Sequence, residues 1–143
     1  MPQVDFYILE DETDSGWLRF ACRLADKIWS GGHRLLIHSD DGRLLRHLDE
    51  LLWTYVDGSF LPHEWWRPEL PSTVAPVLLS DSLPEVAGRD VLMNLAATVP
   101  EAVAEFARVV EIVGGPAARR TQSRDRFRRY RELGHMPNSH KIA

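Results

Sequence analysis

Residues 4–38, VDFYILEDETDSGWLRFACRLADKIWSGGHRLLIH, predict a β-strand, an α-helix and a second β-strand in close succession. Val4–Leu9 is an apolar run rich in β-branched and aromatic residues, which is typical of a buried strand. Arg34–His38 is a shorter run of the same kind. Short links between strand, helix and strand predict a βαβ unit, and such units build parallel sheets.

The helix between these strands carries one apolar stripe, because its apolar residues recur at helical spacing. They are Trp17, Ala21, Leu24, Ala25 and Ile28. Thr13, Asp14 or Ser15 can cap the first turn of this helix. Gly31-Gly32 is expected to end it, since glycine tolerates the left-handed turn that follows a helix.

The same alternation of elements continues downstream. Ser39-Asp40-Asp41 offers caps for a second helix, whose leucines are expected to face the core. These leucines are Leu44, Leu45, Leu48, Leu51 and Leu52. Further strands are predicted at Val77–Leu79, Val91–Leu95 and Val109–Val113, and Pro100 opens a short helix that runs to Phe106. The chain is therefore expected to form one α/β domain over residues 1–143, with a five-stranded, mostly parallel sheet and helices on both faces.

Four segments complete this prediction. Tyr55–Pro76 contains several prolines and aromatic residues, and we interpret it as a long ordered loop. A turn is expected around Pro84–Arg89. A basic helix is predicted over about 118–133, ended by Gly134, and the tail 135–143 is expected to be frayed.

Composition limits the setting of the protein. A chain of 143 residues can bury a core without disulfides or metals. The single cysteine, Cys22, has no partner within the chain, which favours a reducing compartment. The sequence has neither an apolar window of about 18 residues nor a basic-then-apolar N-terminal signal. A cytoplasmic location without membrane contact is therefore expected.

Charge is distributed unevenly along the chain. Residues 119–132 hold seven arginines against Asp125 and Glu132, a net +5, which leaves −9 on the rest of a chain whose total is −4. An acidic body would repel the phosphates of a long nucleic acid. The basic helix is therefore expected to bind a local acidic ligand and not nucleic acid directly.

The motifs of common catalytic and cofactor sites are missing from the sequence. A dinucleotide site needs glycines after the first strand, whereas this chain has four carboxylates there, Glu10, Asp11, Glu12 and Asp14, and it has no G-x-x-x-x-G-K-[ST] or G-x-S-x-G motif. The six histidines are scattered without metal-ligand spacing, and Cys22 is interpreted as a small buried residue. We expect no enzymatic activity, no cofactor and no metal. The acidic cluster leaves one alternative open, an enzyme that uses a divalent cation held by Glu10–Asp14.

The basic helix presents one stripe of special composition. Arginines and an aromatic residue share an arc of roughly 100° on a helical projection. They are Arg120, Arg124, Phe127, Arg128 and Arg131. Guanidinium groups bind carboxylates through paired hydrogen bonds, and an aromatic ring beside them offers an apolar contact. The stripe suits an acidic peptide that ends in an aromatic residue with a free carboxylate; a solvated basic helix with Phe127 turned inward remains open.

A second candidate surface is aromatic. It comprises Trp53 and the segment Phe60-Leu61-Pro62-His63, followed by Trp65-Trp66. Aromatic residues dominate the energetics of protein interfaces, so this segment could dock a partner. It could equally cover an edge of the sheet.

Read in order, these segments resemble the chi subunit of bacterial DNA polymerase III. The resemblance rests on six stretches: Val4–Leu9, Trp29–Ile37, Leu48-Asp49-Glu50-Leu51-Leu52-Trp53, Ser59-Phe60-Leu61-Pro62-His63, Pro76-Val77 and Arg124–Gly134. Leu-Asp-x-x-Leu-Trp followed by Ser-Phe-x-Pro-His is the most specific of these. The resemblance spans nearly the whole chain.

The resemblance implies a Rossmann-like fold without nucleotide chemistry and a clamp-loader accessory subunit. Such a subunit binds the acidic C-terminal tail of single-stranded DNA-binding protein. Carried over by position, the tail site comprises Val113, Arg120, Arg124, Phe127, Arg128 and Arg131. The surface for the psi subunit, or for another clamp-loader or repair protein, comprises Trp53, Phe60, Leu61, Pro62 and His63.

The chain departs from the family pattern at two places. Phe127 stands where a tyrosine is more usual, which removes a hydroxyl group from the tail site. Trp65-Trp66 belongs to an insertion in the segment Glu64–Thr73, so the second surface is expected to differ. The resulting hypothesis is a non-catalytic adaptor in DNA replication; its rival is a module that binds single-stranded nucleic acid through the arginine helix.

Overall fold

The computed structural model describes residues 2–55, 61–66, 75–83 and 89–142. Phe60, most of the turn predicted at Pro84–Arg89 and parts of the loop predicted at Tyr55–Pro76 lie outside these residues. In chain order the elements are β1 (Gln3–Leu9), α1 (Asp14–Ser30), β2 (Leu35–His38), α2 (Gly42–Thr54), β3 (His63–Trp65), β4 (Val77–Ser80), β5 (Val91–Asn94), the 3₁₀ helix η1 (Glu101–Glu105), β6 (Arg108–Val113), α3 (Ala117–Glu132) and β7 (Asn138–Ile142).

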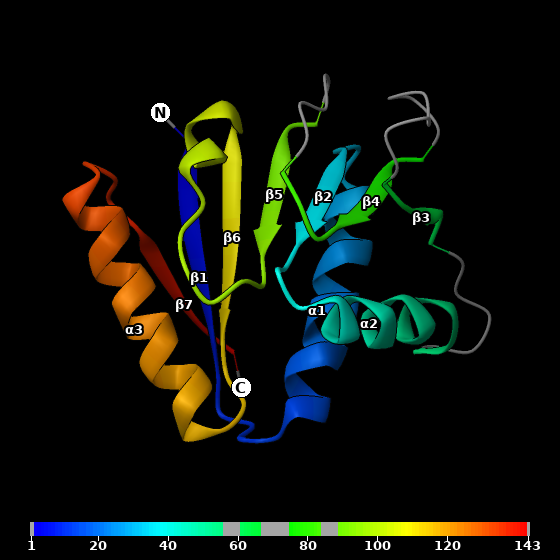
Figure 1. Cartoon of the computed structure of the whole chain (residues 1–143), viewed down its shortest axis with the longest axis horizontal. Coiled ribbons are helices and arrows are strands. Elements are labelled where there is room, and N and C mark those ends of the chain that lie inside the picture. Colours follow the sequence, from blue (N-terminus) through cyan, green and yellow to red (C-terminus); the bar gives the residue numbers. More distant parts are fainter. Residues whose placement is uncertain (1, 56–60, 67–74, 84–88, 143) are drawn as a thin grey trace.

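The strands form one parallel sheet, which confirms the α/β class. Within the described residues its order is β3-β4-β2-β5-β6-β1-β7, and every neighbouring pair is parallel (Figure 1). The prediction of five strands is wrong, since the sheet has seven. The two additional strands, β3 and β7, lie at opposite edges of the sheet. Neither contains an apolar run like that of β1, so neither has the pattern by which the other five were predicted.

Helices cover both faces of the sheet, as predicted. Side chains alternate along β1, so that Phe6 points to the face covered by η1 and α3, and Leu9 points to the face covered by α1 and α2. Figure 1 shows α3 on one side of the sheet and α1 with α2 on the other. The two faces bury two separate apolar clusters.

Helix α1 begins and packs as its sequence predicts. The hydroxyl of Thr13 accepts a hydrogen bond from the Gly16 N–H at 3.0 Å, which caps the helix. All five residues of the predicted apolar stripe are buried. Gly32, just beyond the helix, has φ +87, a left-handed conformation that glycine adopts without strain. Cys22 is buried, and its burial raises the pKa of the thiol to about 12, so the thiol stays protonated.

The tail does not fray as expected but forms β7 beside β1. The Asp5 carboxylate is buried and accepts hydrogen bonds from Gln3 Nε2 at 2.9 Å and Arg108 Nε at 2.9 Å, and His140 Nε2 on β7 lies 3.0 Å from it. Burial alone would raise the pKa of Asp5, but these hydrogen bonds outweigh it and hold the pKa below its usual value. The His140 ring also stacks on Tyr7, with ring centroids 5.1 Å apart. These contacts anchor β7 from a distant part of the chain.

Candidate functional site

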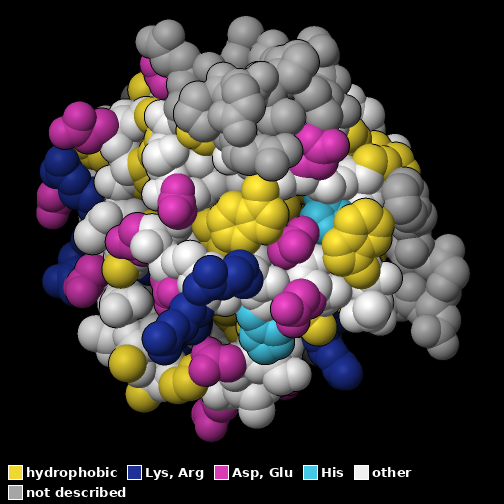
Figure 2. Space-filling model, turned by 45° about the vertical axis from the view of Figure 1, so that its right-hand side comes forward, with side chains coloured by type: hydrophobic (Ala, Val, Ile, Leu, Met, Phe, Trp, Pro, Cys, Tyr) yellow, Lys and Arg dark blue, Asp and Glu magenta, His cyan; other side chains and the backbone are white. Residues whose placement is uncertain are grey.

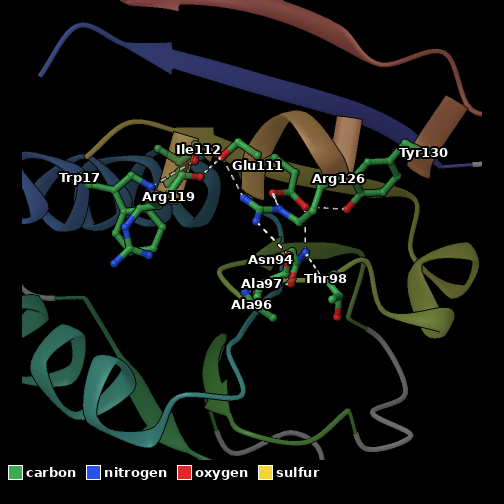
Figure 3. Close-up of polar contacts among 11 residues, drawn as sticks. Trp17, Asn94, Ala96, Ala97, Thr98, Glu111, Ile112, Arg119, Arg126 and Tyr130 are labelled. Atoms are coloured by element: carbon green, nitrogen blue, oxygen red, sulfur yellow. Dashed lines mark hydrogen bonds and ion pairs between the residues drawn. The ribbon is translucent and has the colours of Figure 1, made fainter. Parts of the chain in front are cut away.

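Helix α3 is attached to the sheet by a buried polar cluster. Glu111 on β6 is fully buried, and its carboxylate accepts hydrogen bonds from Arg126 Nε at 2.8 Å, from the Tyr130 hydroxyl at 2.7 Å and from Asn94 Nδ2 at 2.8 Å (Figure 3). Arg126 also donates to the hydroxyl of Ser123 at 3.1 Å. Burial raises the pKa of Glu111, while the ion pair with Arg126 and the hydrogen bonds from Tyr130 and Asn94 oppose that rise. The cluster sets which side of α3 faces the sheet.

Several arginines of the basic helix are neutralised by carboxylates. Besides Arg126, Arg119 contacts Asp14 at 3.1 Å and lies over the Trp17 ring, 3.9 Å from its centroid. Within α3, Arg128 pairs with Asp125 at 2.8 Å and Arg129 with Glu132 at 3.4 Å. Within the described part of the chain, the arginines of α3 without an ion pair are Arg120, Arg124 and Arg131. The cationic surface of α3 is therefore smaller than its +5 suggests.

A pocket of about 290 Å³ lies between α3, β1, the end of β6 and β7. Its lining combines apolar side chains with two arginines and two serines: Phe6, Ile8, Val113, Phe127, Arg120, Arg124, Ser123 and Ser139. The Phe127 ring is half-buried and meets Phe6 edge to face, with centroids 5.0 Å apart. Phe127 thus both packs inward and lines the pocket, so the two alternatives left open by its spacing are combined.

Arg120 is held in place by the backbone at the ends of β1 and β6. Its Nε donates to the Gly115 carbonyl at 3.2 Å, and its Nη2 donates to the carbonyls of Leu9 at 2.8 Å and Asp11 at 3.1 Å. A guanidinium has five N–H donors, so these bonds leave the Nη1 pair for a ligand. Arg124, by contrast, is exposed at the pocket with its full fork.

Four of the six residues predicted for the tail site come together at this pocket: Val113, Arg120, Arg124 and Phe127. Arg128 and Arg131 are exposed on α3 but do not line it. The prediction missed Phe6, Ile8, Ser123 and Ser139. Phe6 and Ile8 alternate on one face of the first strand, which was a usable signal, whereas Ser139 belongs to a segment expected to be frayed.

The pocket combines a small apolar floor with a cationic rim. Its volume is at the low end of the range of about 300–1,000 Å³ for ligand sites. That space suits one or two side chains of a peptide. The apolar floor would take a ring, and a guanidinium at the rim would pair with a carboxylate beside it. The geometry fits an acidic peptide that ends in an aromatic residue.

The carboxylates after β1 have structural contacts. Asp11 Oδ1 accepts a hydrogen bond from the Thr13 N–H at 2.8 Å, and Asp14 binds Arg119 across the link to α3. The hydrogen bonds from Thr13 hold the pKa of Asp11 below its usual value. These two acids therefore stabilise the turn before α1 and its contact with α3.

The second candidate surface has one exposed aromatic residue over two buried ones. Trp53 on α2 is 52% exposed, and its ring lies 4.4 Å from that of His63, measured between centroids. His63 is buried between Asp49, whose Oδ1 lies 2.9 Å from Nε2, and the Leu61 carbonyl, 2.7 Å from Nδ1. Leu61 is also buried and Pro62 is half-buried. Figure 2, which brings the α2 side forward, shows exposed hydrophobic side chains among acidic, basic and histidine side chains.

None of the described helices is long and apolar enough to cross a bilayer.

Comparison with known proteins gives a consistent result. The sequence model of the family described as DNA polymerase III chi subunit, HolC, matches residues 1–138. The chain is 37% identical over 142 residues to DNA polymerase III subunit chi of Pseudomonas aeruginosa, covering 99% of this chain and 98% of the relative. It is 29% identical over 144 residues to the Escherichia coli protein of the same name, with 97% of each chain covered. The protein of that name from Haemophilus influenzae is 29% identical over 130 residues, with 90% of each chain covered. The resemblance stated from the sequence is confirmed.

Proposed function

Because the chain belongs to the DNA polymerase III chi subunit family, we propose that it is a non-catalytic replication adaptor that binds the acidic C-terminal tail of single-stranded DNA-binding protein and links it to the clamp loader. The observation that carries the proposal is the pocket beside α3. It joins an apolar floor to arginines that form no ion pair within the described residues. An acidic peptide with a terminal aromatic residue matches both parts.

The pocket suggests how the tail binds. The terminal aromatic ring enters between Val113 and Phe127, where it can meet Phe127 edge to face. The exposed Arg124 fork pairs with the terminal carboxylate. The acidic residues upstream are attracted by the unpaired cations around the pocket, which speeds the encounter of the two molecules.

Arg124→Ala is expected to weaken the tail complex at least tenfold, about 1.4 kcal/mol, because the terminal carboxylate loses its bidentate partner. The measurement is fluorescence anisotropy of a labelled acidic peptide ending Asp-Asp-Ile-Pro-Phe. Arg128→Ala is the matched control: Arg128 lies one turn further along α3, is paired with Asp125 and is expected to have a small effect. Deleting the terminal Phe of the peptide should remove binding. If wild-type protein does not bind this peptide at low salt, the adaptor proposal is wrong.

The same titration tests direct binding of nucleic acid. A labelled single-stranded oligonucleotide replaces the peptide, and the salt dependence of its binding is measured. Tight binding with a steep salt slope, in the absence of peptide binding, would favour the rival module. The ion pairs of Arg119, Arg126, Arg128 and Arg129 argue against that rival, since they reduce the charge that phosphates would meet.

The link to the clamp loader is assigned in this proposal to the surface around Trp53. Its exposed ring is supported from below by His63 and Asp49, so it is held ready for a partner, such as the psi subunit, without a large loss of side-chain freedom.

Trp53→Ala is expected to weaken the complex with purified clamp loader by at least about 2 kcal/mol, as removal of a tryptophan hot spot does. Co-elution of the two components in size-exclusion chromatography would then be lost, while binding of the tail peptide stays as in wild type. Unchanged co-elution would show that this surface is not the attachment site.

A further inference from the structure

A lysine on the C-terminal strand completes the ring of unpaired cations around the pocket. Lys141 is exposed and forms no ion pair within the described part of the chain. The pairs between β1 and β7 set Ser139 beside Phe6 and Lys141 beside Ile8. Because side chains alternate along a strand, Ser139 and Lys141 point to the same face, about 7 Å apart along β7. Ser139 lines the pocket, so Lys141 lies next to its edge.

A second hollow places Lys141 beside Arg120. This hollow has a volume of about 550 Å³ and is lined by Lys141 together with Ile8 and Arg120, and the latter two also line the pocket. The two hollows therefore form one continuous surface between α3 and β7, with the pocket at one end and Lys141 toward the other. Figure 1 shows β7 beside β1, on the side of the sheet where α3 lies.

Arg120 needs support at this end of the site. Three of its five N–H donors are used by backbone carbonyls, so it offers a carboxylate only the Nη1 pair. Resting on the proposed function, we propose that Lys141 is a further binding residue for the acidic peptide, and that its ammonium group pairs with a peptide carboxylate at the Arg120 end of the pocket. Two cations from two different elements then hold that carboxylate.

The neighbouring acids limit the site. Glu10 and Glu12 line the far part of the second hollow, where they repel further carboxylates of the peptide. The acidic segment therefore ends at Lys141 and does not continue past the end of β1. The Asp5–His140 contact on the opposite face of β7 holds the strand, and with it Lys141, in this position.

The chain offers an unusually clean test, because Lys27 and Lys141 are its only lysines. Lys141→Glu is expected to weaken binding of the labelled peptide ending Asp-Asp-Ile-Pro-Phe about tenfold, and Lys141→Arg is expected to retain binding. Lys27→Glu makes the same charge change on α1, on the other face of the sheet, and should leave binding within about twofold. The thermal unfolding midpoint of each variant shows whether β7 remains docked.

A cross-linking measurement tests the contact in the unmodified protein. Carbodiimide joins a carboxylate and an amine that are in contact, and mass spectrometry locates the resulting amide. We expect the peptide to be joined to Lys141 and not to Lys27. If the peptide binds wild type and Arg124→Ala weakens it, but Lys141→Glu does not and no Lys141 product forms, this inference is wrong and the adaptor proposal stands. If wild type fails to bind the peptide, both are overturned.

Discussion

Arg126→Ala is expected to lower the free energy of unfolding by about 3–5 kcal/mol, the range measured when one partner of a buried ion pair is removed. Glu111 is fully buried, and Arg126 is its cationic partner at 2.8 Å. Without the guanidinium, the carboxylate must either remain buried without a counter-charge or take up a proton. Urea unfolding followed by circular dichroism would measure the loss.

Two further variants separate this explanation from a general effect of losing an arginine. Arg128→Ala removes an exposed pair on the same helix and is expected to cost less than about 1 kcal/mol. Arg126→Ala combined with Glu111→Gln should recover part of the stability, because the buried charge is then gone. A loss of stability as small as that of Arg128→Ala would show that the buried cluster does not attach α3 to the sheet.

Val113→Asp is expected to weaken binding of the tail peptide about a hundredfold, equivalent to about 2.7 kcal/mol. Val113 is half-buried at the end of β6 and lines the pocket. An aspartate there would place a negative charge against an anionic peptide and would make the floor polar where an aromatic ring is expected. Anisotropy with the labelled peptide gives the change in affinity.

The matched control is Val99→Asp. Val99 is also half-buried and packs against the same apolar cluster as Val113, but it lines a different hollow, beside Arg126 and Arg129. The peptide should bind this variant about as tightly as wild type. Equal losses in the two variants would mean that the effect comes from the shared cluster and not from the pocket.

Local sequence patterns were sufficient for the elements that bury a regular apolar face. The apolar run of β1, the stripe of α1 and the cap at Thr13 all appear where they were predicted. The family motif Leu-Asp-x-x-Leu-Trp with Ser-Phe-x-Pro-His also has a structural explanation. It brings Asp49 and Trp53, one turn apart on α2, into contact with His63 on β3.

Two strands could not be found in this way. β7 has the sequence NSHKI, and its side chains are mostly exposed. Its position depends on pairing with β1 and on the contact of His140 with Asp5, 135 residues earlier in the chain. No local pattern reports a partner so distant, and the contribution of Ser139 and Lys141 to the surface beside α3 was hidden for the same reason.

The sequence by itself determined the α/β class, the family and the stripe on α3 that contains Arg120, Arg124 and Phe127, because these follow from periodicity, capping and short motifs. Only the tertiary structure decided which cations of that helix remain unpaired. A helical projection treats all seven arginines alike, whereas burial against β6 gives Arg126 to Glu111 and contact with α1 gives Arg119 to Asp14. Ion pairing depends on distances of a few ångströms between elements far apart in the chain, and those distances exist only once the sheet and α3 have packed together.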